Sequence, residues 1–160
     1  VHTLADGPQP IRWIGSRRVE ATGKLAPIRI KAGALGNFRD LTVSPNHRMM
    51  IRGPKAEMLF GERDVLVAAK HLVNDDTIRR VPGGTVDYFH MLFDSHQIIF
   101  AEGCPTESLY PGQEALGAVD PEARAEILTL FPDFEHGPQQ TELSRYELKA
   151  WEAQALKRAS

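Results

Sequence analysis

Cysteine is almost missing from this chain: only Cys104 is present among 160 residues, so no disulfide can form within it. A miniature fold held together by disulfides is therefore excluded, although one cysteine does not identify a cellular compartment. Long hydrophobic runs are missing as well. Apolar runs such as Ile98–Ala101 are far shorter than the roughly 20 apolar residues of a membrane-spanning helix. No membrane insertion is expected.

An excess of charge of one sign is also lacking. The chain has 19 Lys and Arg against 21 Asp and Glu, for a formal net charge of -2. No large basic field exists to attract nucleic acid, so no nucleic-acid partner is expected. Hydrophobic residues make up 42% and charged residues 25% of the chain, as is usual for a globular domain.

Familiar catalytic signatures are missing too. The sequence contains neither a phosphate-binding glycine loop nor a Gly-x-Ser-x-Gly turn. No cofactor is expected. Val1 is not an initiator methionine and no signal peptide is visible, which is expected of a sequence that begins inside something larger. The six histidines and the single cysteine remain as candidates for chemistry.

Short apolar segments predict a mainly β architecture up to about residue 110. The predicted strands are 11–14, 27–31, 41–43, 49–51, 86–93 and 97–101. Residues 94–96 are predicted to form a hairpin loop between the last two. For Val65–Ala69, periodicity leaves two alternatives open, a buried strand or the start of a short helix.

The character of the chain changes near Pro111 and Gly112. Two helices are predicted beyond it, near 121–131 and 142–158, joined by a polar linker at 135–140. In the second helix, Leu148, Trp151 and Ala155 share one predicted face. Whether that helix docks on the β region is left open.

His47 is the most interesting candidate for proton transfer. It follows the turn signal Ser44-Pro45-Asn46 between two predicted strands, and a tight turn can bring a hydroxyl and an imidazole to one small pocket. Imidazole is the usual proton-transfer group near neutral pH. Spacing alone, however, favours a simpler alternative in which His47 merely ties down a loop.

A zinc site is a weaker alternative. Its candidate ligands are His90, His96 and Cys104. Structural zinc sites favour short paired spacings, and the gaps between these three residues are wider. Cys104 alone is more often a small buried apolar residue than a nucleophile. No metal is therefore expected.

Four segments together resemble the bacterial hedgehog/intein-type (Hint) domain family, and they occur in the family's order. They are Asp6–Gly15, Arg39–Met50, Val65–Val73 and Val86–Gly112. Within the last segment, the resemblance rests on Tyr88–Asp94, on His96 and on Pro105–Ser108. The resemblance covers about residues 3 to 131.

This resemblance implies an all-β, horseshoe-like fold and a domain that cleaves its own backbone. In the family, a cysteine or serine attacks the preceding carbonyl and replaces the amide by a thioester or an ester. A histidine with a threonine three residues upstream assists, and the matching positions here are His47 and Ser44. His96 matches a later position beside the active cleft, with a less defined role.

Two departures from the family pattern shape the functional hypothesis. The segment that carries the nucleophile does not precede Val1 in this sequence, so an incomplete and inactive fragment is expected. No His-Asn dipeptide occurs near residues 100–112, which favours hedgehog-like cleavage over splicing. The predicted division is a Hint domain at 1–115 and a helical extension at 116–160.

The leading hypothesis is a single-turnover autoprocessing domain whose partner is its own upstream polypeptide. The alternative is a non-catalytic β-rich module of a large secreted bacterial protein. The resemblance favours an extracellular destination.

Overall fold

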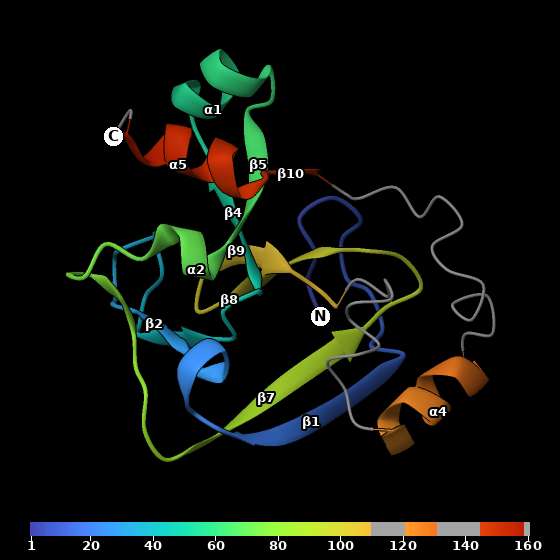
Figure 1. Cartoon of the computed structure of the whole chain (residues 1–160). Helices are drawn as coiled ribbons and strands as arrows, with labels where there is room; N and C mark the ends of the chain where they lie inside the picture. Colours follow the sequence, from blue (N-terminus) through green and yellow to red (C-terminus); the bar gives the residue numbers. More distant parts are fainter. Residues whose placement is uncertain (110–120, 131–144, 159–160) are drawn as a thin grey trace.

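The computed structural model describes residues 1–109, 121–130 and 145–158. Three sheets carry most of the structure, so the predicted mainly β class is confirmed. A two-stranded ribbon of β1 and β7 runs below a five-stranded sheet of order β10-β5-β4-β9-β8, and β3-β2-β6 forms the third sheet (Figure 1). None of the helices in the described segments is long and apolar enough to cross a membrane.

The elements follow one another along the chain with these bounds. The strands are β1 (Trp13–Glu20), β2 (Ile28–Ile30), β3 (Leu41–Val43), β4 (Arg48–Arg52), β5 (Asp64–Ala68), β6 (Ile78–Arg80), β7 (Thr85–Leu92), β8 (Ile98–Ala101), β9 (Cys104–Glu107) and β10 (Tyr146–Glu147). The helices are the 3-10 turn η1 (Gly23–Leu25), α1 (Pro54–Phe60), α2 (Ala69–Leu72), α4 (Pro121–Leu130) and α5 (Ala150–Arg158).

The open question at Val65–Ala69 is answered by both alternatives in turn. Val65, Leu66 and Val67 are fully buried in β5, and the chain passes directly into α2 at Ala69. A continuous apolar run is typical of a strand that is covered on both faces. Val65 and Val67 contact the helical side of the sheet, while Leu66 packs with Met50 and Ile98 on the other.

The predicted hairpin at 94–96 is wrong. β7 pairs antiparallel with β1, with His90 opposite Gly15, whereas β8 pairs with β9. Residues 94–96 therefore connect two different sheets. The actual hairpin turns at Glu102 and Gly103, both with positive φ. Pairing between strands far apart in sequence is not encoded in the local pattern that suggested a hairpin.

The C-terminal segment also differs from its prediction, which was a helix over 142–158. Tyr146 and Glu147 form a strand parallel to β5, and the helix begins only at Ala150. Its buried apolar residues are Ala153 and Leu156, whereas Trp151 is 65% exposed. The predicted helical face was wrong for Trp151, because Leu148 lies before the helix rather than on it. The predicted linker at 135–140 lies outside the described residues.

Candidate functional site

The turn at Ser44–His47 is held by main-chain hydrogen bonds on both sides. The His47 amide donates to the Ser44 carbonyl at 3.1 Å and closes the turn. The amides of Ala69 and Lys70 donate to the carbonyls of His47 and Pro45, each at 2.9 Å. Pro45 has a fixed φ and no amide hydrogen, which suits this position. The start of α2 therefore fixes the backbone of the candidate histidine.

The His47 side chain bonds to a threonine on β9. Its Nε2 atom is hydrogen-bonded to the Thr106 hydroxyl, and that hydroxyl donates to the Arg48 carbonyl at 2.9 Å. A hydroxyl has a single hydrogen to donate. Since Thr106 uses it on Arg48, it must accept from Nε2, so the neutral imidazole carries its proton on Nε2. The Nδ1 atom has no hydrogen bond to any residue in the described segments and stays available as a proton acceptor.

Burial keeps His47 neutral near pH 7. Desolvation of the packed imidazole lowers its pKa below the ordinary value of 6.5. The nearby Glu107 carboxylate opposes this change, and the Arg48 guanidinium adds to it. A neutral imidazole with a free nitrogen is the form that can act as a general base.

Glu107 is the centre of a largely buried network beside Thr106. It accepts from the Arg48 amide at 3.0 Å and from Arg48 Nη1 at 3.0 and 3.2 Å. His96 Nε2 lies 3.5 Å from the same carboxylate. Burial raises the pKa of Glu107, but the bond to His96 and the charge of Arg48 outweigh it and leave the pKa lowered. The carboxylate is therefore ionised at neutral pH.

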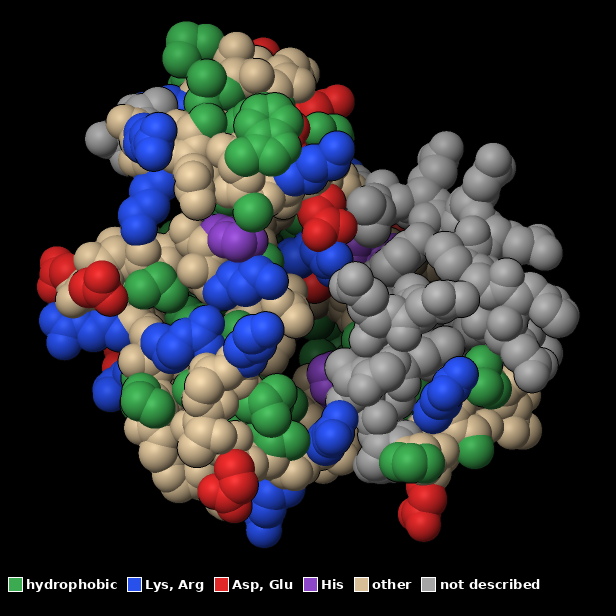
Figure 2. All heavy atoms as spheres, in the orientation of Figure 1, with side chains coloured by type: hydrophobic (Ala, Val, Ile, Leu, Met, Phe, Trp, Pro, Cys, Tyr) green, Lys and Arg blue, Asp and Glu red, His purple; other side chains and the backbone are tan. Residues whose placement is uncertain are grey.

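A second imidazole, that of His90, belongs to the same neighbourhood. His90 lies on β7 opposite Gly15, and the Trp13 indole fills the space above Gly15 that a side chain there would occupy. Burial lowers the pKa of His90, and repulsion from His47, when both rings are protonated, and from Arg17 lowers it further. Figure 2 shows a hollow near the centre of this face, between the β1–β7 ribbon and the five-stranded sheet, with histidine side chains on its wall. Imidazole side chains are suited to proton transfer near neutral pH.

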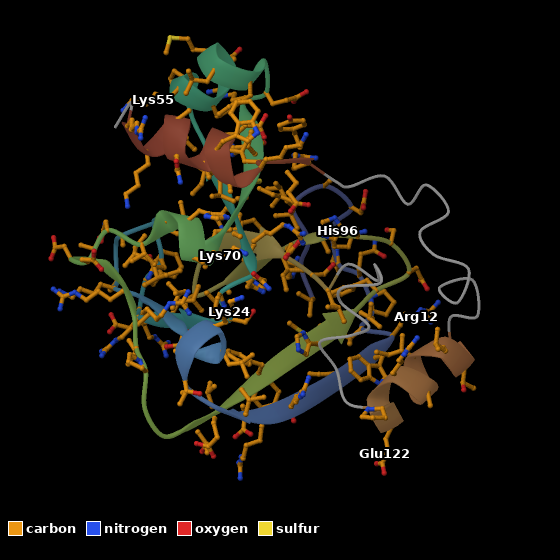
Figure 3. The ribbon with its side chains drawn as sticks, in the orientation of Figure 1. Arg12, Lys24, Lys55, Lys70, His96 and Glu122 are labelled. Atoms are coloured by element: carbon orange, nitrogen blue, oxygen red, sulfur yellow. The ribbon has the colours of Figure 1, made fainter. Side chains whose placement is uncertain are left out.

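The three candidate residues occupy different places. Ser44 is partly buried and lies on the same turn as His47, but among the described residues its hydroxyl has no hydrogen bond. His96 comes from the segment between β7 and β8 and points inward (Figure 3), with its side chain fully buried against Glu107. Only His47 combines partial exposure with a defined tautomer.

Thr106 and Glu107 were missed by sequence reasoning. Both lie in Pro105–Ser108, a segment in which the sequence indicated only the family resemblance, and their neighbours in space are 58 and 59 residues away in sequence. A polar pair in a buried strand was the available signal, since buried polar groups are expected to have partners.

The alternative zinc site is not assembled. No three His, Cys, Asp or Glu side chains within the described ranges come together as a metal site. Cys104 lies in a hydrophobic cluster with Ile28, Met49 and Ala69, where burial raises its pKa. It behaves as a small apolar residue there.

Comparison with known proteins agrees with this architecture. No curated protein and no solved structure matches the chain significantly. A family model described as Hint domain matches residues 1–113, which is well over half of the chain. The chain therefore belongs to the Hint domain family, whose members are autoprocessing domains that act on their own polypeptide.

Proposed function

We propose that this domain promotes cleavage of the backbone ahead of it by an N-to-S or N-to-O acyl shift, with His47 as the proton carrier. The observation that supports this is the hydrogen bond between His47 Nε2 and the Thr106 hydroxyl, which also lies 2.9 Å from the Arg48 carbonyl. Thr106 holds the proton on Nε2 and leaves Nδ1 to exchange a proton with a reacting group. Such a group accelerates reactions by roughly 100- to 10,000-fold.

The proton balance uses one nitrogen twice. Nδ1 takes the proton from the attacking thiol or hydroxyl, and the sulfur or oxygen bonds to the preceding carbonyl carbon. The carbon–nitrogen bond then breaks, and Nδ1 returns the proton to the departing amide nitrogen, which becomes an amine. Water or a small thiol finally attacks the ester or thioester and releases the upstream chain. Glu107, at the centre of the neighbouring network, favours the transient imidazolium.

Ser44 and His96 have supporting roles in this proposal. The Ser44 hydroxyl, on the turn that carries His47, contacts the reacting peptide group. His96 is buried behind Glu107 and acts by holding that carboxylate rather than by touching the substrate. The nucleophile is a cysteine or serine placed ahead of these residues, as the family resemblance implies.

The test uses a fusion in which a Hint N-terminal segment with its cysteine precedes Val1 and follows a reporter protein. Mass spectrometry measures release of the reporter with and without added thiol. We expect release, and a loss of about 100-fold or more in His47→Ala. His71→Ala is the matched control, because His71 is a partly buried histidine on α2 whose pKa burial also lowers. It should cleave like the unmodified fusion.

Two results would decide against the proposal. Equal release by the His47→Ala fusion would remove His47 from the reaction. No release by any fusion, with all of them folded, would favour the alternative of a non-catalytic β-rich module. The chain 1–160 fused directly to the reporter serves as the uncleaved reference, since it brings no cysteine or serine in the required position.

A further inference from the structure

A segment beyond the family-matched residues 1–113 forms part of the five-stranded sheet that also contains β4 and β9. β10 extends the sheet by pairing with β5, and the Leu148 amide donates to the Leu66 carbonyl at 2.8 Å. Figure 1 shows α5 lying across this end of the sheet near α1. Leu148, Ala153 and Leu156 enter one hydrophobic cluster with Val65 and Val67. The segment is therefore held by main-chain bonds and by burial.

This segment places a carboxylate on Arg48. Glu147 Oε1 lies 2.6 Å from Arg48 Nε, and Glu107 Oε2 lies 3.0 Å from Arg48 Nη1. The Arg48 side chain is only 23% exposed, so the ion pairs are weakly screened by solvent. One guanidinium thus bridges two carboxylates that come from β9 and from β10.

Arg48 is the residue that directly follows His47, and its charge disfavours the imidazolium form. The proposed reaction passes through that form each time Nδ1 holds the extra proton. A carboxylate that offsets the Arg48 charge makes the imidazolium easier to reach. Among the described residues, the charged or titratable groups near the turn also include Glu107 on β9 with His96 against it, His90 on β7, and Lys70 on α2, whose ammonium donates to Asn46 at 2.8 Å.

We infer that Glu147 is a positioning residue for the proposed processing reaction: it is supplied by the C-terminal strand, it pairs with the Arg48 guanidinium, and it thereby offsets the positive charge beside His47. This inference rests on the proposed function of His47. It extends the functional unit of the chain past residue 113, to the end of α5.

The place of Glu147 depends on docking of the whole segment. Glu152, in the first turn of α5, accepts from the Lys149 amide at 2.7 Å and from the Tyr146 hydroxyl at 3.0 Å. These bonds fix the bend between β10 and α5. Glu147 sits inside that bend, so its carboxylate is delivered to Arg48 only when β10 is paired.

The test compares Glu147→Gln with a control that breaks an ion pair of similar length. Asp64→Asn removes the partner of Arg52 at 2.7 Å and of Arg145 at 3.6 Å, at the other end of the β4–β5 pair. Both variants remove the carboxylate partner of an arginine on β4 and a contact of the docked C-terminal segment. Only Glu147→Gln changes the charge next to Arg48.

The first readout is the titration midpoint of the His47 ring, followed by NMR in the full chain of 160 residues. We expect Glu147→Gln to lower the midpoint by about 0.3 pH unit, the size of shift that a single solvent-screened charge not in contact with the ring produces. Glu147→Asp should recover most of the difference, and Asp64→Asn should titrate like the unmodified chain. A merely structural ion pair would lower the melting temperature in both variants and leave the midpoint unchanged, which would overturn the inference.

The second readout is the cleavage rate in the reporter fusion. Glu147→Gln should lower it about twofold near neutral pH, the fold-change that corresponds to about 0.3 pH unit, with Asp64→Asn unchanged. If His47→Ala cleaves normally, the proposed function fails whatever Glu147 does. If His47→Ala is inactive and Glu147→Gln matches Asp64→Asn in both rate and midpoint, the inference alone fails.

Discussion

The Thr106 hydroxyl accepts from His47 Nε2 and donates to the Arg48 carbonyl at 2.9 Å, so one oxygen sets both the ring orientation and the tautomer of the candidate histidine. The bond joins residues 59 positions apart. It ties the turn before β4 to β9, the neighbouring strand.

Thr106→Val should therefore slow cleavage in the reporter fusion by about 10-fold or more, because the imidazole loses the partner that fixes its proton. Valine keeps the shape but leaves Nε2–H without an acceptor, at a cost of about 1–3 kcal/mol. Thr106→Ser should recover most of the rate. Thr42→Val on β3, an exposed threonine, is the control. Equal rates for Thr106→Val and Thr42→Val would show that this hydroxyl is not needed.

The stability of the chain should fall as the pH drops below about 6.5. Burial lowers the pKa of both His47 and His90 from the ordinary value of 6.5. The unfolded chain then binds protons at a higher pH than the folded one. The free energy of unfolding therefore decreases as the pH falls from 6.5 toward the lowered pKa values. Urea unfolding at pH 7.5, 6.5 and 5.5 measures the effect.

The contribution of Glu107 to stability belongs to a lower range of pH. Its pKa is lowered from 4.5, so its contribution is complete above that value and is lost as the pH falls through the folded pKa.

His90→Gln should flatten the dependence of the unfolding free energy on pH between pH 6.5 and 5.5. The loss of stability below pH 4.5, which belongs to Glu107, should not change. An equally steep profile in that variant would exclude His90 as a source.

Gly15→Ala should disturb the ribbon at the point where it carries His90. A methyl group at Gly15 would lie 2.4 Å from two ring atoms of Trp13, so the indole must move. We expect a loss of about 1–3 kcal/mol in unfolding free energy, typical of overpacking. Trp13 is 6% exposed and Trp151 is 65% exposed, so a red shift of the buried tryptophan emission reports the displacement. Ser16→Ala, at the adjacent exposed position, should change neither the unfolding free energy nor the tryptophan emission.

Local patterns in the sequence predicted individual strands well and their partners poorly. The segment at 86–93 was recognised as a strand because its β-branched and aromatic residues favour extended backbone. Its partner is β1, roughly 70 residues upstream, and nothing in the local pattern identifies that pairing. The same limit applies to the site. The turn at Ser44–His47 was visible in sequence, but Thr106 and Glu107 reach it only through the β4–β9 pairing.

The docking face of α5 offers a direct comparison between pattern and packing. Sequence periodicity selected Trp151, yet this residue is 65% exposed, while Leu156 is 8% exposed and packs in the cluster with Val65 and Val67. The bend at Lys149, held by Glu152, rotates the helix relative to the strand before it. A periodicity counted through that bend therefore combines residues that do not share a face.

Leu156→Ala should accordingly destabilise the chain by about 2–4 kcal/mol, the usual cost of a large-to-small change in a core. Trp151→Ala should change the unfolding free energy by less than about 0.5 kcal/mol, as surface substitutions do. Urea unfolding followed by circular dichroism measures both. If Leu156→Ala also releases β10, the His47 midpoint should move in the same direction as in Glu147→Gln, because the Glu147 carboxylate leaves Arg48. A large loss for Trp151→Ala with little for Leu156→Ala would instead mean that the helix docks through the face that periodicity selected.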